Sequence, residues 1–410
     1  MSFRLSSLVR KTSCIPLANS LTNLTKTTKT IRINSWLTSR KFATATTSEL
    51  IKYKLPENSF KAYECESPSL DIEITKEEII NMYRDMVLIR RMETTADGLY
   101  KSKMIKGFCH LCTGQEAACV GIEAAITRDD AIITAYRCHG YAMTRGALPR
   151  NIFAELTGKA TGVSKGKGGS MHMFAKNFYG GNGIVGAQVP VGTGVAFAQK
   201  YLGTNNATFI LYGDGAANQG QVFEAYNMAK LWDLPAIFVC ENNLYGMGTS
   251  ANRSSASTEY YKRAGYIPGI QINGMDVLAV KQGSKWAKDW TSSGKGPIVI
   301  ELVTYRYGGH SMSDPGTTYR TREEIKHMRS TNDPITGLRL RILDLELLTE
   351  TDLKQIEKDV RSIIDKAAQE AQNDPIPDDS ELYTDVYAKG SEIPIIRGCE
   401  REEFRVFSNQ

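Results

Sequence analysis

The chain has 410 residues, of which 41% are hydrophobic and 23% are charged, as is typical of a soluble globular protein. It contains no run of about 18 apolar residues, so we expect no membrane insertion, and its eight cysteines are too sparse for a disulfide scaffold, so we expect reduced thiols. The net charge of +5 comes from residues 1–48, which carry eight Lys or Arg and no acid, whereas the remainder has 42 basic and 45 acidic residues. A basic nucleic-acid-binding body is therefore excluded.

The first segment, residues 1–45, is rich in Arg, Ser and Thr, and apolar residues such as Phe3 and Leu5 alternate with Arg4. These features are typical of a mitochondrial transit peptide. The alternative is a disordered basic arm that binds nucleic acid or membrane. We favour targeting to the mitochondrial matrix, because the basic charge stops abruptly before Glu49. Residues 46–74 are then an N-terminal extension.

Helices and strands alternate along the next region, residues 75–335. Thr75 and Glu78 form a capping-box pattern that predicts the start of a helix. Further helices are predicted at Gln115–Ile126, 151–157 and Gln188–Tyr201, and strands at Ala131–Thr134, Thr208–Tyr212, Ala236–Cys240 and Ile298–Thr304. This alternation predicts an α/β fold with a mainly parallel sheet and helices on both faces.

The C-terminal region, residues 336–410, is predicted to be helical at first. Thr349 with Asp352 predicts the start of a helix that has regularly spaced apolar residues. The acidic tail contains Pro375 and Pro377 and is expected to be irregular surface structure.

Polar residues follow the predicted strands. Tyr136-Arg137 comes after the first strand, Asp214 after the second and Asn243 after the third, while His310 lies in a glycine-flanked loop after the fourth. The carboxyl ends of parallel strands form the ligand-binding edge of an open sheet. A carboxylate and an amide oxygen suit Mg²⁺, and an arginine can grip a phosphate. Ordinary turn residues at strand ends are the alternative.

Two glycine-rich segments resemble nucleotide-binding loops only superficially. Residues 181–186 match G-x-G-x-x-G, but no strand precedes them and no acid follows about 20 residues later. Residues 162–170 are one residue short of a P-loop, and Gly168 stands where Ser or Thr should be. We therefore expect a loop that brings its backbone close to a diphosphate, or else a tight turn with close helix packing.

Cysteines and histidines near residue 110 suggest a metal site, but their spacing fits no common zinc pattern. We expect Cys109, Cys112 and the other nearby thiols to be buried instead. His110 follows a Gly-Phe turn and is expected to face the active site. We expect structural roles for His139 and His172 and a surface position for His327.

Seven collinear motifs carry a clear resemblance to a known family. They are GFCH at 107–110, YR at 136–137, GKGGSMH at 166–172, GGNGIVGAQVP at 180–190, YGDGAANQGQ at 212–221, CENNLYGMGT at 240–249 and YRYGGHSMSDPG at 305–316. The chain resembles the α subunits of the mitochondrial pyruvate dehydrogenase complex from about residue 75 to 335. The resemblance implies a thiamine diphosphate-binding fold and pyruvate as substrate. The alternative is the branched-chain 2-oxo acid dehydrogenase α subunit, which shares the architecture but usually lacks several of these motifs.

The resemblance also implies cofactors and site residues. Thiamine diphosphate would be bound with Mg²⁺, and the ring of the cofactor would act as the electron sink for loss of CO₂. The implied Mg²⁺ ligands are the side chains of Asp214 and Asn243 and the backbone carbonyl of Tyr245. The remaining roles fall to Tyr136, Arg137, Gly215, Ala216 and His310 at the diphosphate, Gly183 and Val185 at the aminopyrimidine, and His110 and Ala175 at the substrate side. His310 and His110 are the implied catalytic residues.

Partners follow from a missing group. The carboxylate that thiamine enzymes use to polarise the aminopyrimidine is not identifiable in this chain, and the resemblance places it on a β subunit. We therefore expect an α₂β₂ heterotetramer that transfers an acetyl unit to a lipoyl group on a dihydrolipoyl acetyltransferase core.

Regulation is implied as well. Phosphorylation of Ser311 by a kinase, reversed by a phosphatase, would add negative charge beside His310. Thr318 and Ser250 are further candidate phosphorylation sites. The alternative is that Ser311 only forms bonds within its loop. Gly308 departs from the family, because many relatives have histidine there.

Overall fold

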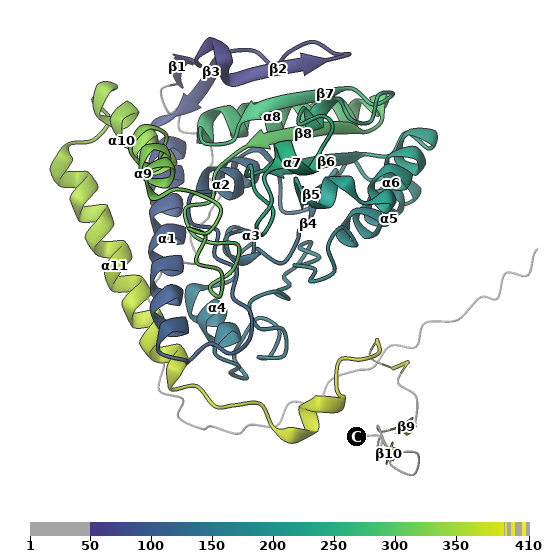
Figure 1. Cartoon of the computed structure of the whole chain (residues 1–410), viewed down its shortest axis with the longest axis vertical. Coiled ribbons are helices and arrows are strands. Elements are labelled where there is room, and N and C mark those ends of the chain that lie inside the picture. Colours follow the sequence, from purple (N-terminus) through teal and green to yellow (C-terminus); the bar gives the residue numbers. More distant parts are fainter. Residues whose placement is uncertain (1–49, 389, 392–394, 398–403, 407–410) are drawn as a thin grey trace, which may run out of the picture. The chain divides into compact units, whose positions relative to one another are not determined.

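The computed structural model in Figure 1 describes residues 50–388, 390–391, 395–397 and 404–406. The expected transit peptide lies outside the described residues, as do residues 46–49 of the expected N-terminal extension. Within the described part of the chain, none of the helices has the length and apolar character needed to cross a bilayer.

The centre of the fold is a six-stranded sheet in the order β2-β7-β8-β6-β5-β4. Its strands are β2 (Phe60–Tyr63), β4 (Ala131–Ile133), β5 (Thr208–Gly213), β6 (Ala236–Asn242), β7 (Gly269–Asn273) and β8 (Ile298–Val303). All neighbouring pairs are parallel except β2 and β7. The predicted mainly parallel sheet is therefore confirmed.

Helices cover both faces of this sheet, as predicted. Alternate residues of β5 and β6 enter two separate hydrophobic clusters: Phe209 and Val239 belong to the larger, and Ile210 and Phe238 to the smaller. Successive strand side chains point to opposite faces, so each cluster is the core on one face. The larger core contains residues of α1 (Lys76–Lys101), α2 (Glu116–Ala125), α4 (Pro149–Leu156), α8 (Val277–Trp290), α10 (Pro334–Asp344) and α11 (Glu350–Gln372). The smaller contains residues of α5 (Gln188–Tyr201) and α6 (Gly220–Leu231), and these helices lie together beside the sheet (Figure 1).

Local sequence signals explain where several helices begin. Thr75 and Glu78 form a complete capping box at α1, and Thr349 and Asp352 form one at α11. Both starts were predicted, and α5 has the predicted bounds. In contrast, β7 and α8 had no prediction, because the strand is short and contains polar residues at Gln271 and Asn273.

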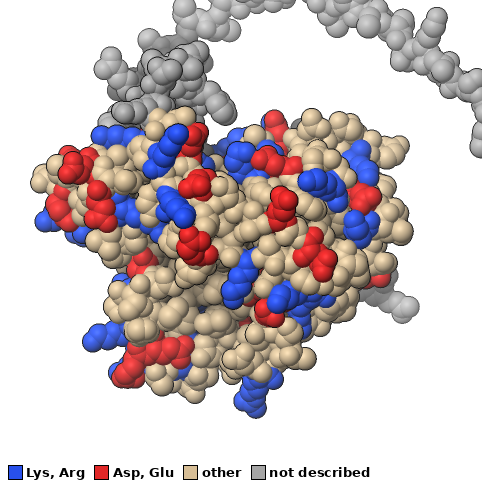
Figure 2. Space-filling model, turned by 90° about the horizontal axis from the view of Figure 1, so that it is seen from above, with Lys and Arg blue, Asp and Glu red and all other residues tan. Residues whose placement is uncertain are grey.

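The remaining elements are short or peripheral. β1 (Leu50–Lys54) pairs with β3 (Asp71–Thr75), and β2 extends the central sheet at one edge. The others are α3 (His139–Thr144), α7 (Ala251–Ser254), α9 (Arg322–Thr331) and the strands β9 (Ile395–Arg397) and β10 (Phe404–Val406). On the face shown in Figure 2, basic and acidic side chains are interspersed.

Candidate functional site

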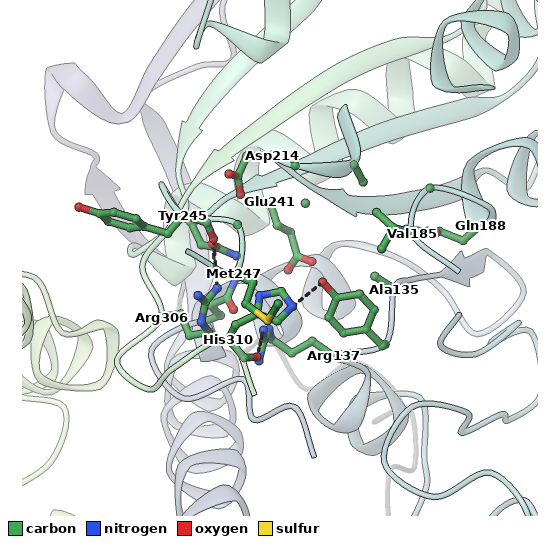
Figure 3. A pocket seen from close by; sticks show the side chains of 18 residues that line it. Ala135, Arg137, Val185, Gln188, Asp214, Glu241, Tyr245, Met247, Arg306 and His310 are labelled. Atoms are coloured by element: carbon green, nitrogen blue, oxygen red, sulfur yellow. Dashed lines mark hydrogen bonds between the residues drawn. The ribbon is translucent and has the colours of Figure 1, made fainter. Parts of the chain in front are cut away.

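A cavity of about 410 Å³ opens where β4, β5, β6 and β8 end. Because these strands are parallel and in register, their carboxyl ends deliver consecutive loops to the same edge. The loops bring nine of the predicted site residues to the cavity wall: Tyr136, Arg137, Val185, Asp214, Gly215, Ala216, Asn243, Tyr245 and His310. Figure 3 shows several of these side chains converging on the cavity from different elements.

One wall of the cavity is a cluster of aromatic and imidazole rings. The Nε2 atom of His310 lies 3.1 Å from the hydroxyl of Tyr136. His110 packs beside both, with ring centroids 4.4 Å from Tyr136 and 5.6 Å from His310. Burial, and then the charge of Arg137, lower the pKa of His110 to about 3 and that of His310 to about 4. Both imidazoles are therefore neutral near pH 7, and neutral rings can accept or donate a proton at the cavity.

The loop that carries His310 is held by three arginines. Arg137 donates from Nη2 to the His310 carbonyl over 2.8 Å. Arg306 donates from Nε to the Gly309 carbonyl over 2.9 Å, and Arg320 donates to the Arg306 carbonyl over 2.6 Å. The backbone N–H of His310 donates to Asp314 over 2.7 Å. These bonds fix the position of His310 without using its ring.

The proposed metal ligands lie together at the ends of β5 and β6. Asp214 and Asn243 are buried, and Arg306 donates from Nη1 to the Asn243 side-chain oxygen over 2.9 Å and to the Tyr245 carbonyl over 3.5 Å. Burial raises the pKa of Asp214 above its usual value, and a cation nearby would oppose that effect. Among the described residues no group of three His, Cys, Asp or Glu could hold a metal, so Mg²⁺ here requires amide, carbonyl and ligand oxygens.

Four residues in the cavity wall have a buried polar side-chain atom with no hydrogen-bond partner among the described residues. These atoms are Gln115 Oε1, Gln188 Oε1, Arg306 Nη2 and His310 Nδ1. Buried polar atoms are nearly always paired, because an unpaired one costs about 1–3 kcal/mol. Because all four atoms lie at one cavity, they indicate a site for a polar, hydrogen-bonding ligand. Two of them, Arg306 Nη2 and His310 Nδ1, can donate hydrogen bonds to an anionic group. Thiamine diphosphate has this character, so the residues present fit it.

Two charged residues of this cavity had no predicted role. Arg306 lies within the motif at 305–316 and Glu241 within the motif at 240–249, so both motifs were recognised but these positions were passed over. Glu241 lines the cavity, and its carboxylate accepts a hydrogen bond of 2.8 Å from the Tyr141 hydroxyl. Burial raises the pKa of Glu241 to about 7. A charged residue at the end of the otherwise apolar β6 was the signal that could have identified Glu241.

The other predicted site residues lie outside the cavity wall. His110 packs against Tyr136, which lines the cavity. Ala175 is half-buried and pairs with Phe178 in an isolated β-bridge. Gly183 faces His172, whose ring would lie 3.4 Å from an added Cβ.

The candidate phosphorylation sites differ in exposure. Ser311 is only 7% exposed, and its carbonyl accepts a hydrogen bond from Asp314 N–H. Thr318 is exposed, and Ser250 is the residue before α7.

The cysteines and the remaining histidines have the expected environments. Cys109, Cys112, Cys119 and Cys138 are buried. His139 is fully buried and hydrogen-bonded to Glu93 and Ser170, which confirms a structural environment, and His327 is exposed.

The two glycine-rich segments serve different purposes. Val185 and Gly186 line the cavity, while Gly192 in α5 presses on the sheet so closely that an added Cβ would lie 2.7 Å from Ile133 and Ile210. The expected close helix packing is confirmed at Gly192, whereas approach of the loop to a diphosphate stays a prediction.

The other segment, residues 162–170, folds around one buried carboxylate. The two Glu155 oxygens accept hydrogen bonds from the backbone N–H groups of Ser164, Gly166, Gly168 and Gly169. Because these four N–H groups already bond to Glu155, they are not available to bind a phosphate.

Comparison with known proteins gives one consistent result. The profile of the family described as "Dehydrogenase E1 component" matches residues 84–380. Proteins named "Pyruvate dehydrogenase E1 component subunit alpha, mitochondrial" are similar over most of their length. The one from Saccharomyces cerevisiae is 58% identical over 365 residues, covering 88% of this chain and 87% of that protein. Those from Chaetomium thermophilum and Dictyostelium discoideum are 60% and 58% identical, covering 87% and 82% of this chain and 87% and 89% of those proteins. The chain therefore belongs to the dehydrogenase E1 component family, whose thiamine-binding fold matches the observed architecture.

Proposed function

We propose that this chain is the α subunit of a mitochondrial pyruvate dehydrogenase. It would take part in the oxidative decarboxylation of pyruvate and in transfer of the acetyl unit to a lipoyl group of an acetyltransferase core. One observation carries the proposal. The side chains of Asp214, Asn243, Arg137 and His310 line the same cavity at the edge of the sheet. The relatives that carry the pyruvate dehydrogenase name support pyruvate over branched-chain 2-oxo acids as substrate.

Thiamine diphosphate supplies the electron sink for decarboxylation when it is bound. In this chain Asp214, Asn243 and the Tyr245 carbonyl would hold Mg²⁺, and Arg137 and Arg306 would balance the charge of the diphosphate. The side chains lie at the same cavity, and Arg306 already bonds to Asn243 and Tyr245. Arg306 would thus link the metal ligands to the loop that carries His310.

The histidines would handle protons and position the substrate. His310 and Tyr136 share a hydrogen bond at the cavity wall, and His110 lies behind them. Because both imidazoles are neutral near pH 7, each can donate a hydrogen bond from one ring nitrogen and accept a proton at the other. We assign His110 to the pyruvate side and His310 to the diphosphate side.

A β subunit is the proposed partner that completes the site. The helices α5 and α6 and the residues next to them leave a set of large apolar side chains exposed: Ile184, Val191, Phe197, Tyr201, Leu202, Leu231 and Trp232. Tyr201 is 82% exposed and Leu202 73%. Exposed apolar surface of this kind marks a protein interface. A β subunit on this face would account for it and would bring the carboxylate that polarises the aminopyrimidine.

The proposed function is tested by co-expressing this chain with its β subunit. The complex is expected to decarboxylate pyruvate only when thiamine diphosphate and Mg²⁺ are both present, and to act less well on branched 2-oxo acids. The α chain alone is expected to be inactive. Full activity of the α chain without β, or a preference for branched substrates, would overturn the proposal.

We also propose that Ser311 is the regulatory phosphorylation site. Its carbonyl and neighbouring backbone are held in the His310 loop, so a phosphate of about −1.5 to −2 charge would have to lie beside a cavity built for anions. Such a group would repel the diphosphate and the pyruvate carboxylate. Thr318 and Ser250 are secondary sites, and a kinase and phosphatase are the corresponding partners.

A further inference from the structure

A buried chain of side chains runs from α1 to the backbone of His110. The Glu93 carboxylate lies 3.0 Å from His139 Nδ1, and His139 Nε2 lies 2.8 Å from Ser170 Oγ. The backbone N–H of His110 donates to the same Ser170 oxygen over 3.1 Å. All three side chains are at most 4% exposed, so no water competes for these bonds.

The same glutamate holds the chain on the other side of His110. Glu93 Oε1 accepts hydrogen bonds of 3.0 Å from both the backbone N–H and the thiol of Cys112. Burial acts to raise the pKa of Glu93, but the effects of His139 and of the Cys112 bonds are together larger and lower it. Glu93 is therefore an ionised carboxylate, so His139 must carry a proton on Nδ1.

Tertiary bonds hold each of four consecutive residues here. Besides the two already described, the Cys109 carbonyl accepts from Met312 N–H over 2.9 Å, and the Leu111 carbonyl accepts from Arg137 Nη1 over 2.5 Å. The backbone of residues 109–112 is therefore fixed from three directions. The His110 ring, in contrast, keeps a buried Nδ1 that has no partner among the described residues. A fixed backbone with a free ring nitrogen is the arrangement of a pre-positioned binding group.

We propose that Glu93, His139 and Ser170 are positioning residues that hold the His110 imidazole at the substrate side of the cavity. The proposal rests on the proposed role of His110. Ser170 is not among the residues that line the cavity, and its hydroxyl bonds to the backbone of His110, so its loss would tilt the imidazole rather than remove it. Small errors in the placement of a reacting group can lower rates up to about a hundredfold.

The test is a double-mutant cycle in the complex with the β subunit. The variants are Ser170→Ala, His110→Ala and the two together. Ser164→Ala is the matched control, because Ser164 lies in the same loop and donates to the His172 carbonyl but does not contact His110. The measurements are kcat and KM for pyruvate and Kd for thiamine diphosphate.

We expect Ser170→Ala to lower kcat/KM for pyruvate about tenfold and to leave the Kd for thiamine diphosphate within about twofold. In the His110→Ala background the same substitution should change kcat/KM by less than about twofold, because there is no imidazole left to position. An equal loss in both backgrounds, a parallel loss of cofactor affinity, or an equal effect of Ser164→Ala would overturn the inference.

A second variant covers the case in which Ser170→Ala does not assemble. Glu93→Gln keeps the size of the side chain but removes the charge that fixes His139, and it should show the same dependence on His110. A wild-type complex that is inactive on pyruvate refutes the proposed function itself. An active wild-type complex without this coupling refutes only the positioning role.

Discussion

At the scale of single residues, Arg306 connects the parts of the site. It is 1% exposed, it bonds to the Asn243 side chain, and it keeps one buried nitrogen without a partner among the described residues. Burial, together with the neighbouring charges of Arg137 and Arg320, lowers the pKa of Arg306 to about 10, which leaves it charged near pH 7. Three arginines this close in a buried region repel one another. An anion in the cavity would relieve that repulsion, which supports the proposal that the cavity binds a diphosphate.

Removing the charge of Asp214 should weaken cofactor binding. Asp214→Asn keeps the size of the side chain but removes the only carboxylate among the proposed Mg²⁺ ligands. We expect the Kd for thiamine diphosphate at fixed Mg²⁺ to rise roughly 30-fold, or about 2 kcal/mol, measured by calorimetric titration of the complex. The control is Asp233→Asn, at an exposed aspartate after α6. A Kd unchanged by Asp214→Asn would contradict the assignment.

Adding charge at Ser311 should abolish activity. Ser311→Glu places a carboxylate in the loop beside His310, where Ser311 itself is only 7% exposed. We expect at least about a hundredfold loss of pyruvate decarboxylation, because repulsion of the diphosphate or a shifted loop both remove a productive site. Ser311→Ala serves as the control and should retain most activity. Full activity of the Glu variant would exclude the switch.

Most site residues were predictable because they follow strands. Asp214 and Asn243 each lie within three residues of the end of an apolar run, and the parallel sheet brings such positions to one edge. Glu241 and Arg306 were not predicted as site residues. Each lies in a motif in which roles were assigned to other residues, and Glu241 also lies near the end of β6. Their roles depend on which face of the chain meets the cavity, and sequence spacing does not specify that. The Glu93–His139–Ser170 chain was equally invisible, since its members are 46 and 31 residues apart.

At the scale of elements, the loop after α4 is organised by its glutamate rather than by its glycines. Glu155 is buried and accepts four backbone N–H bonds from residues 164–169. Gly166 and Gly169 have positive φ angles of 76° and 60°, which lets the backbone curl around the carboxylate. The loop therefore ends at a fixed point, where Ser170 begins its contacts with His139.

Replacing Glu155 should destabilise this loop. Glu155→Gln presents an amide N–H₂ to N–H donors, so two of the four bonds become repulsive. We expect a loss of about 2–4 kcal/mol in the free energy of unfolding, measured by urea denaturation of the complex. Glu381→Gln, which removes ion pairs with Lys165 and Lys167 at the surface, should cost much less. A Glu155 variant as stable as wild type would show that the glycines alone hold the loop.

Elements with strong local signals were predictable, and elements defined by tertiary contacts were not. The capping boxes of α1 and α11 specify their own starts. β2 and β7 have no such signal: each is short, β7 pairs with β8, and β2 pairs with β7 at the edge of the sheet. Loop closure across about 200 residues, as between β2 and β7, cannot be inferred from local periodicity.

At the scale of the whole molecule, the buried histidines make stability depend on pH. The folded pKa values of His110 and His310 are about 3 and about 4, below the ordinary 6.5. At pH values between the folded pKa and the ordinary pKa of each histidine, the unfolded chain binds more protons than the folded chain. The free energy of unfolding therefore rises with pH in this range. The contribution is complete above about pH 6.5 and is lost as pH falls toward 4.

The measurement is the unfolding midpoint of the cofactor-free complex between pH 7 and 4.5. We expect the wild type to lose on the order of 2 kcal/mol per buried histidine across this range, after allowance for partial solvent screening. His310→Gln should flatten the profile, and His327→Gln, at an exposed helix position on α9, should leave it unchanged. Identical slopes for wild type and His310→Gln would refute this account.

The four polar atoms in the cavity wall that have no partner among the described residues have a consequence for the half-life of the protein in the cell. A ligand that forms hydrogen bonds with these atoms would stabilise the folded chain, because they have no partner among the described residues. A ligand that binds only the folded state stabilises that state by an amount that grows with the logarithm of the ligand concentration. Vitamin supply would therefore set how much of the subunit survives quality control, as well as how fast each copy works. In cells short of thiamine the amount of this chain should fall, and a pulse-chase measurement of its half-life would show it.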